Sequence, residues 1–476
     1  MITASIAIVL FAGTGQLAAP DSLVVPMWAD TANEVEADIF PPGGAVALPL
    51  YYQVAWGDGD TLTWTGPLRS LTDISRYHKY KAAGQYAVTV QARDSTGRAS
   101  NWSKPYSVSV SFEPIQKGIF NTSDPIVASP TLDRNGNVYI GDESGTLYSV
   151  SPNGNQRWTF KANDAIYGAA AISRDLVYFT SLDSNLYCLD TTGKELWHCY
   201  LNDELYSTPA LGPGGTIYVA TDKGTVAAVS SSGKMLWTHK TSDEIAGSVT
   251  IGRTGLLYVA GDSVHCLEPN GRQRWGFGAP EGDYFYASPV VNDSGVVYVG
   301  NTDGFLYCLG PNGRQQWRAA APEGDEIRSE AVFAPDGSLW FGTDGDFLCR
   351  MQPGAAPEKE YEATDILIST PAVSDKHTMY FLPDDGTLYA LSANGRLLWE
   401  RDVATGEKDV YYTSSPVLAP DGTVYVGSWD GGLYAFRGDG PVAATLWPEY
   451  RRNAQHTGTM APTRPRSKFL WFGSKD

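Results

Sequence analysis

A repeat of about 40 residues constrains the fold of this chain more than any other feature of its sequence. Three segments show it plainly: VYIGDESGTLYSVSPNGNQRW (138–158), VYFTSLDSNLYCLDTTGKELW (177–197) and VYVGNTDGFLYCLGPNGRQQW (297–317). Tryptophans end successive units at spacings of 39, 40, 38 and 42 residues, namely Trp158, Trp197, Trp237, Trp275 and Trp317, and the series continues at Trp399 and Trp447. A second marker counts eight units, at Tyr139, Tyr178, Tyr218, Tyr258, Tyr298, Trp340, Tyr380 and Tyr425.

Each unit divides into four short apolar runs separated by turns rich in Gly, Asp and Asn, which is typical of meander hairpins. Four antiparallel strands at this period indicate the blade of a β-propeller, and a closed ring protects strand edges that a stack would leave open. We therefore predict an all-β chain with an eight-bladed β-propeller over residues 126–450. Residues 113–125 are predicted to be a linker with a ring-closing strand at Gly118–Thr122 that pairs with the last blade, and Trp447–Tyr450 is expected beside it.

The units resemble the PQQ-like propeller repeat, with its Gly-x-x-x-Trp ending, of BamB-like and quinoprotein-type propellers. The resemblance covers residues 126–447 and implies that each Trp docks between neighbouring blades. Enzymes that share this repeat hold a quinone (PQQ) over the ring with a vicinal disulfide, a calcium site and a catalytic Asp. This chain has no adjacent cysteines and its turns are short. We therefore predict no cofactor and no metal, with PQQ as an alternative that the sequence does not support.

Residues 45–110 carry a different pattern, with Trp-Gly-Asp-Gly-Asp at 56–60, His-Lys-Tyr at 78–80 and Gly-Gln-Tyr-Ala-Val at 84–88. Strict alternation puts Tyr86, Val88 and Val90 on one face of a half-buried strand. These motifs resemble the PKD domain, an immunoglobulin-like β-sandwich, which we predict over residues 21–112. Residues 56–60 could form a calcium loop, but a hairpin turn whose aspartates bond their own backbone is favoured. His78 is expected to be a packed sandwich residue.

The balance of 35 basic and 53 acidic residues gives a net charge of -18. Such a surface repels phosphate backbones and anionic lipid, which argues against a nucleic-acid partner and suits cations, neutral sugars or basic partner patches. The apolar run Ile6–Ala12 and the small residues Ala18 and Ala19 resemble a secretory signal over residues 1–20, although no Lys or Arg precedes Arg69. No run reaches the ~18 apolar residues of a membrane span. We predict a secreted, periplasmic or cell-envelope protein.

The five cysteines do not suggest a disulfide framework. Cys188, Cys308 and Cys349 are assigned to the same repeat position, and Cys266 to that position in a diverged unit. Equivalent positions on successive blades should lie farther apart than the ~5.5 Å Cα spacing of a disulfide. We therefore predict that these cysteines pack as small apolar residues.

One rim of the predicted ring combines a regular residue with a variable one. An aspartate precedes the innermost strand of each unit, at Asp124, Asp164, Asp203, Asp243, Asp283, Asp325, Asp365 and Asp409. These carboxylates could collect cations or a basic peptide, but capping of their own turns is favoured. The residue that follows two or three positions later varies: Tyr167, Tyr206, Tyr286, Arg328, Ile368 and Tyr412.

Aromatic residues and Arg dominate the hot spots of interfaces. We therefore predict a binding surface at the channel mouth, formed by Tyr167, Tyr206, Tyr286, Arg328 and Tyr412, with inter-blade packing as the alternative. We assign no catalytic residue.

The resulting hypothesis is a non-catalytic extracytoplasmic scaffold whose propeller rim recognises a protein or polysaccharide partner. One alternative is an enzyme, either a diverged quinoprotein dehydrogenase or a carbohydrate-active enzyme with its site over the channel. Another is a glycan-binding adhesin that uses the PKD-like domain. Residues 451–476 are predicted to be a C-terminal tail, whose basic and aromatic end could dock on the protein's own body or on the envelope.

Overall fold

The computed structural model describes residues 35–39, 50–68, 74–78, 84–103, 105–110, 116–241, 244–245, 247–278, 283–403, 414–445, 448–453 and 456–459. The expected signal peptide lies outside these residues. The chain divides into two compact units, the first formed mainly by the residues up to Ile115 and the second mainly by the residues from Gln116 onward. Three 3-10 helices occur in this part of the chain: η1 (Pro213–Gly215), η2 (Pro322–Gly324) and η3 (Tyr450–Arg452). No helix of the described residues has the length and apolarity that crossing a membrane takes.

The described residues of the first unit form two antiparallel sheets. Its strands are β1 (Val35–Ile39), β2 (Leu50–Ala55), β3 (Thr65–Leu68), β4 (Ile74–His78), β5 (Gly84–Asp94) and β6 (Tyr106–Val110). One sheet has the order β3-β2-β5-β6, and β1 pairs with β4. Val88 and Val90 on β5 are buried, whereas Ala87 is exposed and Thr89 is half-buried, so the predicted alternation along this strand is confirmed.

The described residues of the second unit form eight four-stranded antiparallel sheets, which we number in chain order. Sheets 1 and 2 contain β8 (Thr131–Leu132), β9 (Val138–Gly141), β10 (Thr146–Val150), β11 (Gln156–Lys161), β12 (Ala171–Ser173), β13 (Leu176–Thr180), β14 (Asn185–Asp190) and β15 (Glu195–Tyr200). Sheets 3 and 4 contain β16 (Ala210–Leu211), β17 (Ile217–Ala220), β18 (Thr225–Val229), β19 (Met235–Lys240), β20 (Thr250–Ile251), β21 (Leu257–Ala260), β22 (Ser263–Leu267) and β23 (Gln273–Gly278).

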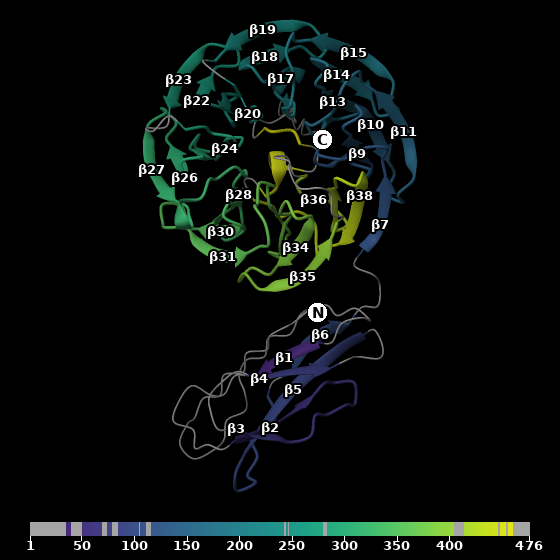
Figure 1. Cartoon of the computed structure of the whole chain (residues 1–476), viewed down its shortest axis with the longest axis vertical. Coiled ribbons are helices and arrows are strands. Elements are labelled where there is room, and N and C mark those ends of the chain that lie inside the picture. Colours follow the sequence, from purple (N-terminus) through teal and green to yellow (C-terminus); the bar gives the residue numbers. More distant parts are fainter. Residues whose placement is uncertain are drawn as a thin grey trace, which may run out of the picture. The chain divides into compact units, whose positions relative to one another are not determined.

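Sheets 5 and 6 contain β24 (Val290–Val291), β25 (Val297–Gly300), β26 (Phe305–Leu309), β27 (Gln315–Ala320), β28 (Val332–Phe333), β29 (Leu339–Gly342), β30 (Phe347–Met351) and β31 (Glu358–Glu362). Sheet 7 contains β32 (Ala372–Val373), β33 (Met379–Phe381), β34 (Thr387–Leu391) and β35 (Leu397–Asp402). Sheet 8 contains β36 (Val417–Leu418), β37 (Thr423–Gly427), β38 (Gly432–Arg437) and β7 (Gln116–Asn121). The sheets follow one another around a ring, with the first strand of each nearest the centre (Figure 1).

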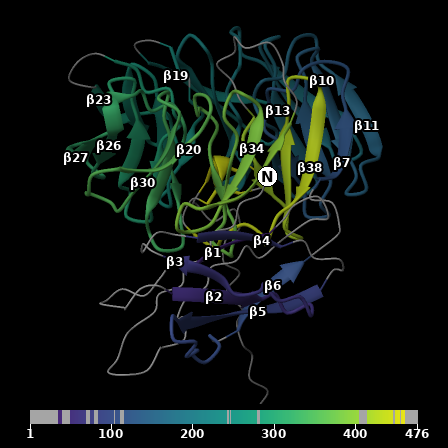
Figure 2. The ribbon, with the colours of Figure 1, turned by 60° about the horizontal axis from the view of Figure 1, so that its bottom comes forward.

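The ring is closed by a strand from the beginning of the unit. β7 pairs with β38, with Gly118 opposite Ala435, and it shows the one-residue register shift found between the outer strands of sheets 1 to 5. Both views show β7 beside β38 (Figures 1 and 2). The ring therefore cannot open without breaking a β-ladder, and the predicted closing strand is confirmed. The expectation for Trp447–Tyr450 is wrong in its described part, because Pro448 and Glu449 bond to the innermost strands β32 and β36.

Neighbouring sheets are joined by the repeated tryptophan. The indole N–H donates to a carbonyl in the turn between the third and fourth strands of the next sheet in four successive joints: Trp158 to Thr191 (2.9 Å), Trp197 to Ser231 (3.0 Å), Trp237 to Pro269 (2.9 Å) and Trp275 to Pro311 (3.0 Å). In that turn a glycine with positive φ lies against the indole, and a Cβ at Gly271 would come within 2.7 Å of Trp237. The Gly-x-x-x-Trp ending thus supplies a receiving glycine and a docking tryptophan, which confirms the predicted docking role.

All five cysteines are free and buried. Cys188, Cys266 and Cys308 occupy one repeat position, because each lies opposite the marker tyrosine of its sheet. The assignment of Cys349 to that position is wrong: it lies opposite Phe341, one residue earlier in the strand, and therefore on the other face of the sheet.

Candidate binding pocket at the channel mouth

The C-terminal segment of the second unit occupies the centre of the ring (Figure 1). Its backbone carbonyls accept hydrogen bonds from the innermost strands of three sheets: Val373 N–H to Pro448 (2.9 Å), Leu211 N–H to Thr457 (3.0 Å) and Ile251 N–H to Gly458 (2.8 Å). The expected tail therefore does not begin at residue 451, because residues 451–453 and 456–459 belong to the ring interior. We call residues 448–453 and 456–459 the central segment.

The central segment carries buried ionisable side chains that reach further sheets. Glu449, Arg451 and His456 are fully buried. Leu418 N–H donates to Glu449 Oε2 (3.0 Å), and His456 Nδ1 lies 3.0 Å from Thr131 Oγ1. Burial raises the pKa of Glu449 to about 8 and, with the nearby Arg451 charge, lowers the pKa of His456 to about 3. Both groups are therefore mainly uncharged near pH 7, which reduces the desolvation cost of placing them inside the ring.

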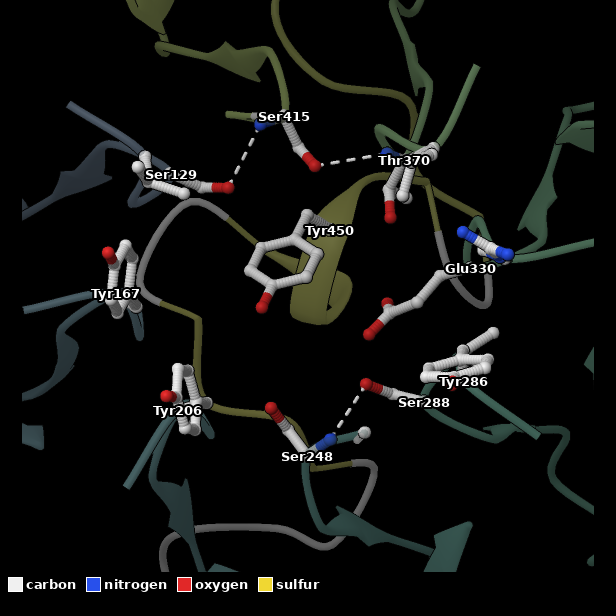
Figure 3. A pocket seen from close by; sticks show the side chains of 15 residues that line it. Ser129, Tyr167, Tyr206, Ser248, Tyr286, Ser288, Glu330, Thr370, Ser415 and Tyr450 are labelled. Carbon is white, nitrogen blue, oxygen red and sulfur yellow. Dashed lines mark hydrogen bonds between the residues drawn. The ribbon is translucent and has the colours of Figure 1, made fainter. Parts of the chain in front are cut away.

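A pocket of about 450 Å³ lies over this segment at the mouth of the channel (Figure 3). Tyr450 and Glu330 contribute its floor. Tyr450 Oη lies 3.1 Å from Thr208 Oγ1. The Glu330 side chain is only 3% exposed and its carboxylate points toward the middle of the pocket. The backbone N–H of Arg451 donates to Glu330 Oε2 (3.3 Å), and the Arg451 guanidinium lies 3.8 Å from Oε1.

A belt of small hydroxyl side chains surrounds the pocket. The belt position of each sheet holds, in chain order, Ser129, Ala169, Thr208, Ser248, Ser288, Glu330, Thr370 and Ser415. The backbone N–H of one belt residue donates to the hydroxyl of the next in five joints: Ala169 to Thr208 (3.1 Å), Thr208 to Ser248 (2.9 Å), Ser248 to Ser288 (3.0 Å), Thr370 to Ser415 (3.0 Å) and Ser415 to Ser129 (3.0 Å). The belt hydroxyls thus bind neighbouring sheets to each other around the channel, and Glu330 is the charged exception.

Sequence reasoning missed Glu330, although alignment of the units on the belt position would have shown it. The six hydroxyl residues of the belt make a carboxylate at this position conspicuous. It also missed the central segment, which has no counterpart in the repeat and therefore no periodic signal.

The structure brings four of the five predicted binding residues together as walls of this pocket, namely Tyr167, Tyr206, Tyr286 and Arg328. Tyr412 lies outside the described residues. Ile368 also lines the pocket. The rings of Tyr167 and Tyr206 stack with centroids 5.6 Å apart, so these two residues also make the contact between sheets that was the alternative reading. The Arg328 guanidinium lies 5.3 Å from the centroid of the Tyr286 ring, and Tyr286 is 45% exposed.

Carboxylates surround the walls. We call Glu143, Glu204, Asp222, Glu244, Glu326 and Asp344 the acidic collar. Tyr167 Oη donates to Glu143 Oε1 (2.9 Å) and Tyr206 Oη to Glu204 Oε2 (3.2 Å). Arg328 Nε donates to Glu326 (2.9 Å) and lies 3.3 Å from Asp344. The collar thus contacts three of the four predicted wall residues directly.

The collar carboxylates repel one another. Burial raises the pKa of Asp344 to about 6; the Arg328 charge opposes this rise, and neighbouring carboxylates, Glu326 first, add to it. Burial also raises the pKa of Asp222, and the charges of Glu244, Asp203 and Glu204 add to the rise. At both positions neighbouring carboxylates add to the rise in pKa, which shows that the collar carboxylates lie close enough to repel one another.

Two of the aspartates that precede the innermost strands cap their own turns, whereas Asp203 Oδ2 accepts the N–H of Lys223 (2.8 Å) in the turn between the second and third strands of sheet 3. Asp164 Oδ1 accepts the N–H of Ala165 (2.8 Å), and Asp365 Oδ1 accepts that of Ile366 (2.9 Å). The favoured turn-capping role is confirmed at these two positions. Asp243 and Asp409 lie outside the described residues.

In the first unit, Asp58, Asp60 and His78 lie close together. Their potential ligand atoms all lie within 4.8 Å of one another. His78 Nε2 lies 2.7 Å from Asp58 Oδ2, its ring stacks on Trp56 at 4.8 Å, and the N–H of Asp60 donates to Asp58 Oδ1 (3.1 Å). These contacts confirm the favoured hairpin turn and the packed role of His78. The residue spacing alone did not show that His78 meets Asp58.

Comparison with known proteins identifies the family of this chain. Residues 87–207, 183–266 and 260–455 match the family described as outer membrane protein assembly factor BamB. No curated protein matches the sequence.

Solved structures with a similar fold include BamB from Moraxella catarrhalis, with a TM-score of 0.56 and 15% identity over 68% of this chain and 99% of that chain. The computationally designed Ika8 protein has a TM-score of 0.56 and 14% identity over 67% and 97% of the two chains, and Sqt1 of Saccharomyces cerevisiae has 0.58 and 11% over 69% and 100%. At these identities the structures show a shared propeller-like fold. The family match spans most of the chain, and the chain therefore belongs to the outer membrane protein assembly factor BamB family of PQQ-like repeat proteins.

Proposed function

We propose that this protein is a non-catalytic, extracytoplasmic scaffold that binds a segment of a partner protein in the pocket at its channel mouth. In this proposal the eight four-stranded sheets are the blades of one closed propeller, and the first unit is a PKD-like sandwich. The observation that carries the proposal is the contrast between the belt and the walls. Hydroxyls recur at the belt position, whereas the walls combine tyrosines, Arg328 and Ile368 around one cavity.

Two further observations support a binding role. Tyrosine and Arg are the residue types that most often supply the energy of protein interfaces, and a concave site lets a partner bury them from several sides. The family is described as an assembly factor of outer membrane proteins, which favours a protein partner and a location outside the cytoplasm.

The pocket is a poor fit for the quinone of PQQ-dependent enzymes. That cofactor carries carboxylates, and the floor and collar present carboxylates of their own. Arg328, the cation on the wall, is held by Glu326 and Asp344. An anionic quinone would have to break these ion pairs and approach Glu330, which costs free energy without a compensating charge. We derive no redox step for this chain.

Affinity capture from an envelope extract of the source organism tests the proposal. Tyr206→Ala and Tyr286→Ala together should abolish capture of the partner by a folded protein. Tyr200→Ala is the matched control, because Tyr200 lies on the outermost strand β15 and is 61% exposed. Unchanged capture by the double variant, or equal loss with the control, would contradict the proposal.

A further inference from the structure

We infer that the pocket recognises a cationic side chain, a guanidinium or an alkylammonium group, presented by the partner. This inference rests on the proposed function and specifies its ligand chemistry. It stands on the combination of an enclosed cavity, a buried carboxylate directed into that cavity, tyrosine walls and an acidic collar.

The floor of the pocket supplies a charge for such a group. Glu330 lines the cavity and is only 3% exposed to solvent. Its contacts with Arg451 involve one backbone N–H at 3.3 Å and a guanidinium at 3.8 Å. A carboxylate has about four acceptor positions, so it can accept further hydrogen bonds from a ligand above it while it keeps these contacts.

The walls supply the second component. Tyr167 and Tyr206 lie on one side of the cavity in the view of Figure 3, and Tyr286 and Glu330 lie on the other. Cations bind favourably to the faces of aromatic rings within about 6 Å. Arg328 already places a guanidinium 5.3 Å from the Tyr286 centroid, which shows that a wall ring accepts this type of contact.

The charges around the pocket favour a cation over an anion or a neutral group. Seven described carboxylates belong to the floor and collar. The cations beside them already form ion pairs: Arg328 with Glu326 and Asp344, Lys223 with Asp203 (3.1 Å), and Arg451 with Glu330 from beneath the floor. An approaching cation relieves the mutual repulsion of the carboxylates, and the chain's net charge of -18 attracts it over longer distances.

Titration calorimetry with defined probes tests this inference on the full chain. The probes are an acetyl-Gly-Arg-Gly amide peptide, the same peptide with the neutral isostere citrulline in place of arginine, the lysine peptide, and free spermidine. We expect the arginine peptide to bind at least about tenfold more tightly than the citrulline peptide, with an affinity that falls as salt rises. Tighter binding of spermidine than of either cationic peptide would contradict a partner side chain as the source of the cation.

Charge-removing variants locate the binding. Glu204→Gln in the collar should weaken the arginine peptide about two- to fivefold, and Glu330→Gln should weaken it more while retaining an acceptor for the Arg451 N–H. Glu268→Gln is the control, because Glu268 follows the third strand of sheet 4, at the end of the sheets opposite the mouth. If Glu330→Gln fails to fold, Glu204→Gln and the comparison of the arginine and citrulline peptides still test whether the pocket recognises a cation.

Equal affinity of the arginine and citrulline peptides, no binding of the arginine peptide at millimolar concentration, or equal weakening by Glu204→Gln and Glu268→Gln would overturn the inference. These outcomes are separable from failure of the proposed function. The double variant Tyr206→Ala, Tyr286→Ala could lose partner capture while the arginine and citrulline peptides bind wild type equally. That result would support the scaffold role and reject only the cationic ligand.

Discussion

The two ends of the sheets differ in how regularly their residues repeat. At the end opposite the mouth, an indole docks on a glycine turn of the next sheet in four successive joints, with the same hydrogen bond each time. At the mouth, the wall residue changes from Tyr167 and Tyr206 to Arg328 and Ile368. A contact that every joint needs must repeat, whereas a surface that meets an asymmetric ligand has no reason to. The difference separates residues that hold the ring together from residues available for binding.

The largest effect on the free energy of unfolding is expected beneath the mouth, where the central segment should stabilise the ring. Arg451→Met removes the cation beside the buried Glu330 and should lower the free energy of unfolding by about 3–5 kcal/mol. Urea unfolding measures this loss. A second change, Glu330→Thr, installs a residue type of the belt and should restore most of the stability, because it removes the uncompensated charge. Equal stability of wild type and Arg451→Met would show that the central segment does not support the ring.

The regular end should show the next largest effect. Trp237→Ala removes an indole that packs on Gly271 and donates to Pro269, and it should cost about 3 kcal/mol. The loss should appear as a lower midpoint of thermal unfolding. Binding to the mouth should be unchanged in the folded variant. A folded Trp237→Ala protein that loses its partner would break the distinction between the two ends.

A pH effect should distinguish the central segment from the mouth. The pKa of Glu449 is raised to about 8 by burial, so the folded state holds a proton that an unfolded Glu has already lost. Stability should therefore fall as pH rises from 6.5 to 8, by at most about 1.4 kcal/mol per pH unit.

His456 opposes this fall mainly below about pH 7.5, because its pKa is lowered from 6.5 to about 3. The folded state is neutral throughout the window, whereas an unfolded His is still partly protonated near pH 6.5. Glu449→Gln should flatten the fall, as measured by urea unfolding at several pH values. A variant with the wild-type slope would contradict the assignment to Glu449.

The smallest effect on stability is expected at the walls. Tyr206→Ala removes one partially exposed ring that stacks on Tyr167, and it should change the free energy of unfolding by less than about 1 kcal/mol. Thermal unfolding of this variant beside Tyr200→Ala checks the expectation. A loss as large as that of Trp237→Ala would favour packing between sheets as the main role of the ring.

Contacts that repeat from sheet to sheet could be predicted from the sequence, whereas contacts made only once could not. Trp158 and its equivalents recur with a glycine four residues before them, so their docking between sheets could be inferred. The closing strand could be predicted because Gly118 occupies the position that the tryptophan has in the other units. Arg451 and Glu449 lie in a segment without a periodic signal, and charged residues after the last repeat suggest an exposed tail. Cys349 was assigned to the wrong position because it lies nine residues after its marker Trp340, whereas Cys308 lies ten residues after Tyr298. A difference of one residue along a strand places the side chain on the opposite face of the sheet.

The most direct test of the account measures partner capture and the free energy of unfolding on the same two folded variants, Tyr206→Ala at the mouth and Trp237→Ala at the opposite end. The account predicts opposite outcomes: Tyr206→Ala captures less of the partner and keeps its stability, and Trp237→Ala keeps the partner and loses stability. Parallel changes in the two variants, with capture following stability in both, would contradict the assignment of binding to the mouth.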